Sequence, residues 1–261
     1  MALIVWIALL ILLPAQALAD NSHSTSQGFH PLSGNAFLSL SMQALQKDAN
    51  ANPASLWIEQ GRALWGSEGQ QSSCFQCHGA LEKNKHVAQQ FPKWSDRLHK
   101  LINLEDQILA CSQRTPKTLQ GLENADVLSL SAALHQVSTG LPFQLIPPEK
   151  YKSQWQSELN EGARLFTTRM GRMNLACTHC HDQLVGKRMR ADVISPGHPT
   201  GFPIFKMSWQ AMGSIDRRLR ACYSGVQADI PAPGSPELRR LELFLKMRSQ
   251  EMPLEGPSLR R

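Results

Sequence analysis

The chain is 261 residues long and carries a formal net charge of +6, with 27 lysines and arginines against 21 aspartates and glutamates. This length suits one or two domains. Beyond the first 19 residues no stretch is apolar enough to cross a membrane, so no membrane span is expected in the mature protein. A positive balance in an exported protein favours acidic proteins or anionic small molecules as partners over nucleic acid.

The N-terminus is an apolar segment, MALIVWIALLILLPAQALAD, in which Ala17 and Ala19 supply the small residues of a cleavage site. It predicts a secretory signal peptide, residues 1–19, that is removed after Ala19. The weaker alternative is an uncleaved anchor, because a bilayer span needs about 20 apolar residues. Residues 20–50, rich in Ser, Gln and Asn, are expected to form an N-terminal extension, either a partner-wrapping arm or a mobile tail.

Two pentapeptides share one pattern, CFQCH at residues 74–78 and CTHCH at residues 177–181. CxxCH is the attachment motif of c-type haem, in which two thiols bind the haem covalently and the adjacent histidine binds the iron. A redox CxxC or half of a zinc site is the alternative for a single copy, but two copies that end in His favour haem. We therefore predict two covalently bound haem c groups, attached through Cys74, Cys77, Cys177 and Cys180, with His78 and His181 as iron ligands.

The remaining cysteines, Cys111 and Cys222, close two apolar series with the same spacing. The series are Leu98, Leu101, Leu104 and Ile108 before the first cysteine, and Trp209, Met212, Ile215 and Leu219 before the second. Spacings of three and four mark one face of an α-helix. We expect each cysteine to lie at the end of such a helical face.

The repeat continues on both sides of these segments. Each cysteine is followed at the same distance by an N-cap candidate, Asn124 or Ser235, and the second is followed by Pro236 at the favoured first helical position. Upstream, GRALW at 61–65 and GARLF at 162–166 precede the two CxxCH motifs. Each half therefore predicts a helix, a CxxCH motif, a helix that ends in Ala-Cys, and a terminal helix.

This order of elements is that of a small cytochrome c domain. The predicted fold class is all-α, with two duplicated cytochrome c-like haem domains at residues 51–140 and 155–261. A Pro-containing linker at residues 141–154 joins them.

An iron with histidine on one face needs a sixth ligand on the other, and Cys is the residue that recurs after both motifs. We therefore expect Cys111 and Cys222 to be distal iron ligands. A Cys111–Cys222 disulfide or the packing of two small apolar side chains stays open as an alternative. Other candidates for the sixth position do not recur between the halves: Met189, Met207, Met212, His86, His99 and His198.

Cys222 differs from Cys111 in its charged surroundings. In RRLRACYSG, Arg218 lies four residues before Cys222 and therefore on the same helical face. A cation so close favours the thiolate, and a guanidinium offers donors that suit a sulfonate. On the residues alone, anion binding and a plain surface charge remain equally open for Arg218, whereas Arg217 and Arg220 are expected to point to solvent and form surface pairs.

Two CxxCH motifs, a cysteine in each half and the run GHPTGFPIFKMSWQAMGSIDRRLRACYSGVQAD at residues 197–229 resemble the SoxA family, dihaem cytochrome subunits of the bacterial sulfur-oxidation system. The resemblance covers nearly the whole mature chain, and RRLRAC with the second CxxCH is its most specific part. It implies an L-cysteine S-thiosulfotransferase. Such an enzyme joins thiosulfate oxidatively to a cysteine of the carrier protein SoxYZ and passes two electrons to cytochrome c.

The resemblance also implies residue roles and partners. Cys222 becomes an iron ligand that carries a persulfide, and Arg218 the residue that binds the anionic substrate. The first haem takes His78 and Cys111 as ligands. Asp216 departs from the neutral or basic residue of the family and is expected to soften the local positive potential. The implied partners are the monohaem cytochrome SoxX and SoxYZ, and the implied location is the periplasm.

Three other functions stay open. A dihaem electron carrier without sulfur chemistry predicts Met or His at the sixth positions. A dihaem peroxidase needs one open distal position, which the repeated cysteine disfavours. A subunit that only transfers electrons, with catalysis in its partner, predicts that replacing Cys222 leaves thiosulfate coupling intact.

Overall fold

The computed structural model describes residues 31–71, 73–114 and 118–261. The predicted signal peptide, its cleavage site after Ala19 and the first part of the N-terminal extension lie outside the described residues. Residues 31–261 pack as one unit. Within the described chain, no helix combines the length and the apolar character that a membrane span requires.

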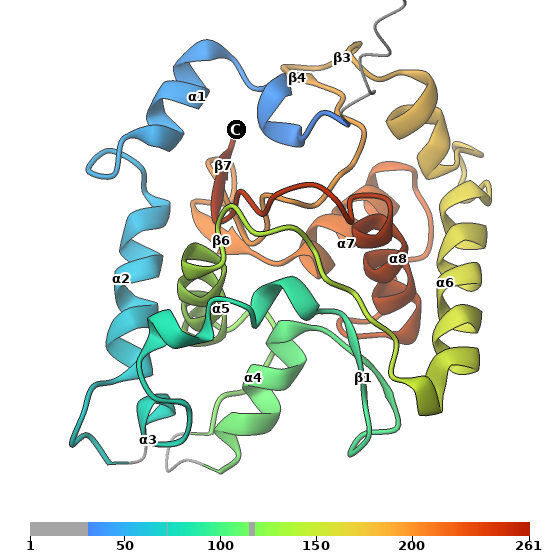
Figure 1. Ribbon diagram of the computed structural model, residues 1–261. Coiled ribbons are helices and arrows are strands. Elements are labelled where there is room, and N and C mark those ends of the chain that lie inside the picture. The colour runs from blue at the N-terminus through green and yellow to red at the C-terminus, as the bar shows by residue number, and fades with distance from the viewer. Residues whose placement is uncertain (1–30, 72, 115–117) are drawn as a thin grey trace, which may run out of the picture. The chain divides into compact units, whose positions relative to one another are not determined.

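Two series of elements, which we call the first half and the second half, make up most of the fold (Figure 1). The first half comprises α2 (Ala54–Trp65), α3 (Cys74–His78), β1 (Lys93–Ser95), β2 (Lys100–Ile102), α4 (Leu104–Ser112) and α5 (Ala125–Val137). The second half comprises α6 (Lys152–Thr167), the π-helical turn η5 (His179–Gln183), β5 (Ile204–Lys206), β6 (Ala211–Gly213), α7 (Ile215–Gly225) and α8 (Pro236–Met247). The remaining elements are η1 (Gly34–Phe37), α1 (Leu40–Lys47), η2 (Leu81–Asn84), η3 (Ala88–Gln90), η4 (Glu149–Tyr151), β3 (Arg188–Met189), β4 (Asp192–Val193) and β7 (Ser258–Arg260).

The two halves repeat the same order of elements. A cis peptide bond precedes each hairpin, at Phe91–Pro92 and at Phe202–Pro203. The pairs β1–β2 and β5–β6 are antiparallel and have the matching register. From these hairpins onward, equivalent residues of the two halves keep one constant offset in the chain. The helices predicted before each CxxCH motif are present as α2 and α6.

Polar side chains start the helices of the repeat. At α4, Asn103 forms a capping box with Asp106, and at the start of α7 the Ser214 side chain accepts from a backbone N–H of the first turn. The two predicted N-caps are confirmed, because the side chains of Asn124 and Ser235 accept from backbone N–H groups of α5 and α8. Each cap satisfies donors that have no partner within the helix.

The helices that carry Cys111 and Cys222 are shorter than predicted. They begin at Leu104 and Ile215, so the earlier members of each apolar series lie in the hairpins. Strands of two or three residues are too short to show an alternation of apolar and polar residues, and a spacing of three continues by chance across the turn. The all-α prediction is therefore corrected to a mainly helical fold with small sheets.

In each half the helix before the CxxCH motif crosses the last helix at a glycine. A Cβ on Gly61 in α2 would stand 1.9 Å from the backbone oxygen of Ser129 in α5. A Cβ on Gly162 in α6 would stand 2.2 Å from the backbone oxygen of Arg240 in α8. Only a residue without a Cβ allows two backbones to approach so closely. The glycines of GRALW and GARLF therefore set these two crossings.

The two halves meet through reciprocal contacts in the interior. Met212 of β6 shares a buried cluster with Ala132 of α5. At the equivalent positions, Leu101 of β2 shares a cluster with Leu243 of α8. A pseudo-twofold relation produces an exchange of this kind. Phe143 and Leu145, in the Pro-containing segment between the halves, are buried in the same cluster as Leu101, so these two side chains anchor the segment to the interior.

The second half has an additional strand. β7 pairs parallel with β5, which gives the order β6–β5–β7, whereas the described residues of the first half form a two-stranded hairpin. The described part of the N-terminal extension lies against this strand, since α1 contacts β7 and Gln46 Oε1 accepts from the Leu259 N–H at 3.1 Å. This part of the extension is therefore packed on the second-half sheet.

Candidate functional site

The second CxxCH motif presents an oriented histidine. His181 Nδ1 donates to the Ser195 carbonyl oxygen at 2.8 Å. The backbone of Gly197 packs on the imidazole, because a Cβ there would stand 3.1 Å from the ring. A carbonyl oxygen only accepts, so the proton stays on Nδ1 and Nε2 is left to bind a metal. His181 therefore carries its proton on Nδ1, which leaves Nε2 with a lone pair that can act as a ligand.

Helix α7 brings Cys222 to this histidine. Burial opposes ionisation of the Cys222 thiol, but the Arg218 guanidinium and the His181 imidazole hold its pKa below the ordinary value. Burial raises the pKa of the Cys177 thiol to about 11, and the Cys222 charge adds to this effect. These mutual influences show that Cys177, His181 and Cys222 belong to one site.

The residues of this site fit a covalently bound haem. The described residues contain no group of three or more His, Cys, Asp or Glu side chains that could hold a metal ion by themselves. A haem iron needs only two axial protein ligands, because the macrocycle supplies the rest. His181 and Cys222 would hold the iron, and Cys177 and Cys180 would hold the haem through two thiols at the spacing that thioether attachment requires.

The first motif has a similar arrangement. Burial raises the pKa of the Cys74 thiol, and the Cys111 charge raises it further, so α4 brings Cys111 to this motif. Gln107 Nε2 donates to Cys111 Sγ at 3.1 Å. The Trp65 and His78 rings lie with their centroids 5.9 Å apart. The sulfur of the first site is thus met by a neutral donor one turn before it.

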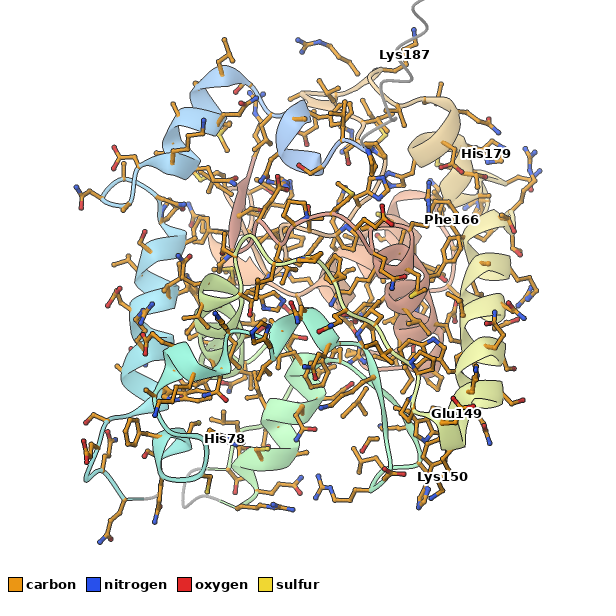
Figure 2. The ribbon with its side chains drawn as sticks, in the orientation of Figure 1. His78, Glu149, Lys150, Phe166, His179 and Lys187 are labelled. Atoms are coloured by element: carbon orange, nitrogen blue, oxygen red, sulfur yellow. The ribbon has the colours of Figure 1, made fainter. Side chains whose placement is uncertain are left out.

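The two motifs form separate sites, and each has its own additional cysteine, Cys111 in the first half and Cys222 in the second. Figure 2 shows His78 at the lower left and His179, the spacer residue of the second motif, at the upper right. All six cysteines are unpaired thiols. The structure therefore contains no Cys111–Cys222 disulfide.

Three arginines precede Cys222 on α7. Arg218 lowers the pKa of the Cys222 thiol, whereas Arg217 and Arg220 contact other groups. Arg217 lies over the Trp209 ring, with 4.2 Å between its Cζ and the ring centroid. Arg220 Nε donates to a proline carbonyl oxygen at 3.0 Å. Both arginines are half-buried. This corrects the expectation that they point to solvent and form surface pairs, because a ring and a carbonyl contact them instead.

Asp216 is engaged inside the protein. Its Oδ2 accepts from the Gly234 N–H at 2.9 Å and from Arg239 Nη1 at 3.0 Å, and the residue is 2% exposed. Burial raises the pKa of the Asp216 carboxyl, and its partners are Gly234 and Arg239 rather than the arginines beside it in the chain. The structure does not support the expectation that Asp216 softens the potential of the arginines beside it.

The methionines and histidines that were considered as alternative sixth iron ligands differ in burial and in hydrogen bonding. Met212 is buried against α5, and His198 shares a hydrogen bond with Ser249 Oγ at 2.8 Å. His86 lies 3.3 Å from the Gln89 amide nitrogen. The three that remain are exposed: Met189, Met207 and His99.

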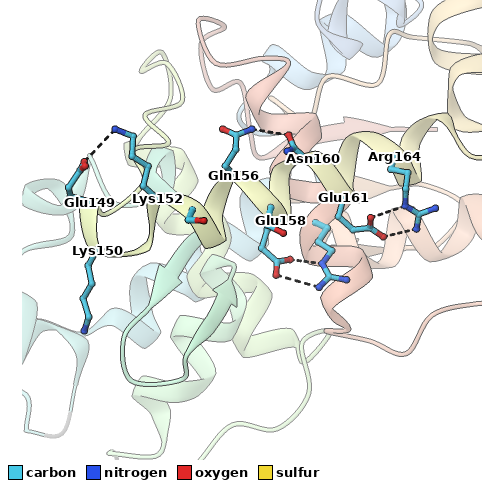
Figure 3. Close-up of a pocket in the computed structure, with 11 residues that line it drawn as sticks. Glu149, Lys150, Lys152, Gln156, Glu158, Asn160, Glu161 and Arg164 are labelled. Carbon is cyan, nitrogen blue, oxygen red and sulfur yellow. Dashed lines mark hydrogen bonds and ion pairs between the residues drawn. The ribbon is translucent and has the colours of Figure 1, made fainter.

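A surface hollow runs along α6 and is lined by none of the motif residues (Figure 3). Most of its charged side chains are paired with one another. Because opposite charges compensate each other there, we assign this hollow no ligand. The pairs are Glu149 with Lys152, Glu158 with Arg240, and Glu161 with Arg164.

Two residues that act on the candidate ligands were missed by sequence reasoning. Gln107 stands in the first half where Arg218 stands in the second, so the repeat itself contained the signal. Ser195 lies in an irregular segment, and no local pattern relates it to His181.

Comparisons with known proteins agree with this architecture. Residues 60–143 match the family model of the SoxA/TsdA cytochrome c domain. The chain is 31% identical over 251 residues to the L-cysteine S-thiosulfotransferase subunit SoxA of Pseudaminobacter salicylatoxidans, covering 94% of this chain and 85% of the relative. It is 30% identical over 234 residues to the corresponding subunit of Rhodovulum sulfidophilum, covering 87% and 79%.

A solved structure extends the comparison to the fold. The chain matches a chain of SoxXA from P. pantotrophus with a TM-score of 0.79 and 25% identity, over 88% of this chain and 87% of that one. The predicted cytochrome c-like fold is therefore confirmed.

Proposed function

The chain belongs to the SoxA family of L-cysteine S-thiosulfotransferase subunits, and we propose that it acts with a SoxX-like monohaem cytochrome to join thiosulfate to a cysteine of a SoxYZ-like carrier protein. In this reaction the outer sulfur of thiosulfate forms a bond with the carrier sulfur, and the carrier S–H bond breaks with release of its proton. Two electrons pass to a c-type cytochrome. The product on the carrier is a cysteine S-thiosulfonate.

The observation that carries this proposal is the meeting of Cys222, His181 and Arg218 in one site. A nearby cation favours the thiolate, the form of cysteine that binds iron and attacks sulfur. A guanidinium binds an oxyanion through parallel N–H donors. We therefore place the covalent sulfur intermediate on Cys222 as a persulfide, and assign Arg218 to the anionic substrate.

We further propose two covalently bound haem c groups, one in each of two duplicated domains at residues 51–140 and 155–261, with residues 141–154 as the connection. The reciprocal contacts of Met212 and Leu101 support the duplication. When bound, each haem supplies an electron acceptor to its site. The residues that would hold the two groups are Cys74, Cys77, His78 and Cys111 in the first half and Cys177, Cys180, His181 and Cys222 in the second.

A periplasmic location after removal of residues 1–19 completes the proposal. The apolar N-terminal segment and the two CxxCH motifs support it, because both are typical of exported proteins that carry haem c. The partner cytochrome is supported by the solved structure that this chain resembles, which is a SoxXA complex.

Replacement of each distal cysteine tests the assignment of the chemistry to the second half. The holo-chain in complex with its cytochrome partner is given thiosulfate, carrier protein and oxidised cytochrome c, and the carrier product is followed by mass. We expect Cys222→Ser to lower the rate roughly a thousandfold or more, as loss of a covalent group does. The matched variant Cys111→Ser should keep at least about a tenth of the rate, because that cysteine only ligates in this proposal.

Intact mass of both variants checks that two haems remain attached. A simple dihaem electron carrier predicts no thiosulfate product in any form of the protein. Full activity of Cys222→Ser with both haems in place would sink the proposed chemistry and favour catalysis in the partner.

A further inference from the structure

Three cationic side chains, Lys206, Arg218 and Arg260, lie together in the second half, and we call them the cation cluster. The parallel pairing of β5 with β7 places Lys206 directly opposite Arg260. Side chains of residues that stand opposite each other in a sheet project from the same face. Arg218 lies in the first turn of α7, the helix that follows β6 of the same sheet.

The charges of the cation cluster act on one another. Burial and the Arg218 charge lower the pKa of Arg260 to about 10, against the opposing effect of Glu255. Burial also lowers the pKa of Lys206, and the charges of Arg218 and Arg260 add to this, whereas Asp192 opposes it. Like charges that lie close together destabilise a fold unless an anion compensates them.

Lys206 Nζ donates to the main-chain oxygen of Arg261. No described Asp or Glu side chain forms an ion pair with any member of the cation cluster. Glu255 instead accepts hydrogen bonds from the hydroxyls of Ser33 at 2.9 Å and Thr200 at 2.8 Å. Asp192 lies on the short strand β4 and is exposed to solvent. The position is therefore suited to an anion from outside the chain.

Arg260 is held in place by two segments that are distant from it in the chain. Its Nη1 donates to Asn35 Oδ1 at 2.8 Å. Its Nη2 lies against Gly34 and Gly201, because a Cβ on either glycine would stand 3.0 Å from this atom. A half-buried guanidinium that is fixed in this way presents its charge with little loss of side-chain entropy on binding.

We propose that the cation cluster binds the sulfonate end of a dianionic sulfur oxoanion, so that Lys206 and Arg260 are specificity-determining residues in addition to Arg218. This inference rests on the proposed function, in which the bound dianion is the thiosulfate that reacts at Cys222. The cluster directs the outer sulfur to the thiol. It also disfavours neutral and singly charged sulfur compounds, because they leave more of the cluster uncompensated.

The first half supports this reading by contrast. At the positions equivalent to Arg218 and Lys206 it has Gln107 and Ser95, and its described residues contain no strand equivalent to β7. In this half the Cys111 charge acts on Lys93, where it partly offsets the lowering of the Lys93 pKa by burial. A CxxCH motif with an additional cysteine therefore occurs in the first half without an equivalent of the cation cluster. The cluster is found in the second half, where we place the chemistry.

Sulfate tests the site without turnover, because it is a dianion that has no reactive outer sulfur. Sulfate is titrated calorimetrically into the oxidised holo-complex at constant ionic strength maintained with chloride. We expect Lys206→Met to weaken sulfate binding about tenfold, and to raise the KM for thiosulfate by a similar factor with kcat within about twofold. Arg260→Lys, which keeps the charge and loses the planar fork, is expected to weaken binding about threefold.

Lys187→Met is the matched control, since it removes an equal charge from an exposed position of the second half (Figure 2). It should leave sulfate binding unchanged within about twofold. Binding that is absent in the unaltered complex, or that is unaffected by both Lys206→Met and Arg260→Lys, overturns the inference. So does an equal loss in Lys187→Met, which would indicate a general effect of surface charge.

The inference and the proposed function can fail separately. If the complex conjugates no thiosulfate, yet the cluster variants still weaken sulfate binding, the anion site stands and the proposed function fails. If conjugation persists with an unchanged KM in the cluster variants, the proposed function stands and the anion site fails.

Discussion

The cysteine sites of the two halves are built from the same elements and differ in the charges around the sulfur. In each, a hairpin leads through an N-cap into a helix that brings a cysteine to a CxxCH motif. One turn before the cysteine, the first half places Gln107, which donates to Cys111 Sγ, and the second half places Arg218. The scaffold therefore positions the sulfur, and the position one turn back supplies a neutral donor in the first half and a cation in the second.

The two equivalent contacts between the halves also differ in charge, because one is apolar and the other is ionic. Leu128 of α5 packs in an apolar cluster with Met212 of β6. The equivalent position of α8 is Arg239, which is 2% exposed and reaches Asp106 with 2.6 Å from Nε to Oδ2 and Asp216 with 3.0 Å from Nη1 to Oδ2. One of two related contacts is thus apolar and the other is a buried ionic network. The ionic network is the one attached to α7, the helix that carries Cys222.

The largest effect is expected from removal of the buried guanidinium. Arg239→Met leaves Asp106 and Asp216 without their cation, and should lower the free energy of unfolding of the holo-protein by about 3–5 kcal/mol. Leu128→Met, at the equivalent position, conserves volume and should cost less than about 1.5 kcal/mol. Urea unfolding followed by circular dichroism measures both. Equal losses would show that the ionic contact contributes no more than its apolar counterpart.

A smaller, pH-dependent effect concerns Glu105, the first-half residue at the position equivalent to Asp216. Glu105 accepts from the Ser131 hydroxyl at 2.7 Å, whereas Asp216 has the guanidinium of Arg239. Burial and the nearby Glu242 raise the pKa of Glu105 to about 7.

The folded state therefore binds this proton more tightly than the unfolded chain, whose Glu pKa is about 4.3. The resulting stability is fully present below about pH 4 and is lost as the pH rises through about 7. Glu105→Gln should flatten the fall in unfolding free energy between about pH 5 and 7.5 by about 2 kcal/mol. A series of urea titrations across this range measures the slope, and a slope equal to that of the unaltered chain contradicts the assignment.

The smallest expected effect comes from giving the second site the residue of the first. Arg218→Gln should raise the KM for thiosulfate about tenfold, which corresponds to about 1.4 kcal/mol, because a neutral donor replaces a charged one at the substrate. Arg220→Gln removes an equal charge from the same helix and should change KM less than about threefold, since Arg220 is engaged with a backbone carbonyl. Steady-state kinetics of the complex with carrier protein decide it, and equal shifts in both variants would assign the effect to the charge of the helix as a whole.

The features that sequence analysis found are those that depend on residues close together in the chain. Asn124 and Ser235 were recognised as N-caps because a cap acts on the next turn. Arg218 and Cys222 were placed together because four residues make one helical turn. The hairpins were missed, because strands of three residues carry too few positions to show alternation.

The features that sequence analysis missed depend on residues far apart in the chain. Asp216 was assigned to the arginines beside it, and instead it contacts Arg239, which another helix brings to it. Lys206 and Arg260 could not be related, because only the parallel pairing of two strands places them opposite each other. No local spacing encodes such a pair.

The sequence by itself determined the chemistry that each half can offer. Two CxxCH motifs, the additional cysteines Cys111 and Cys222, and the constant offset between the halves are properties of the covalent chain that folding does not change. Only the tertiary structure decided which charges surround each sulfur. Asp216 forms an ion pair with the buried Arg239. The additional strand β7 places Arg260 opposite Lys206. The physical reason is that ligand spacing is set along the chain, whereas an electrostatic environment is a sum over neighbours that packing brings together.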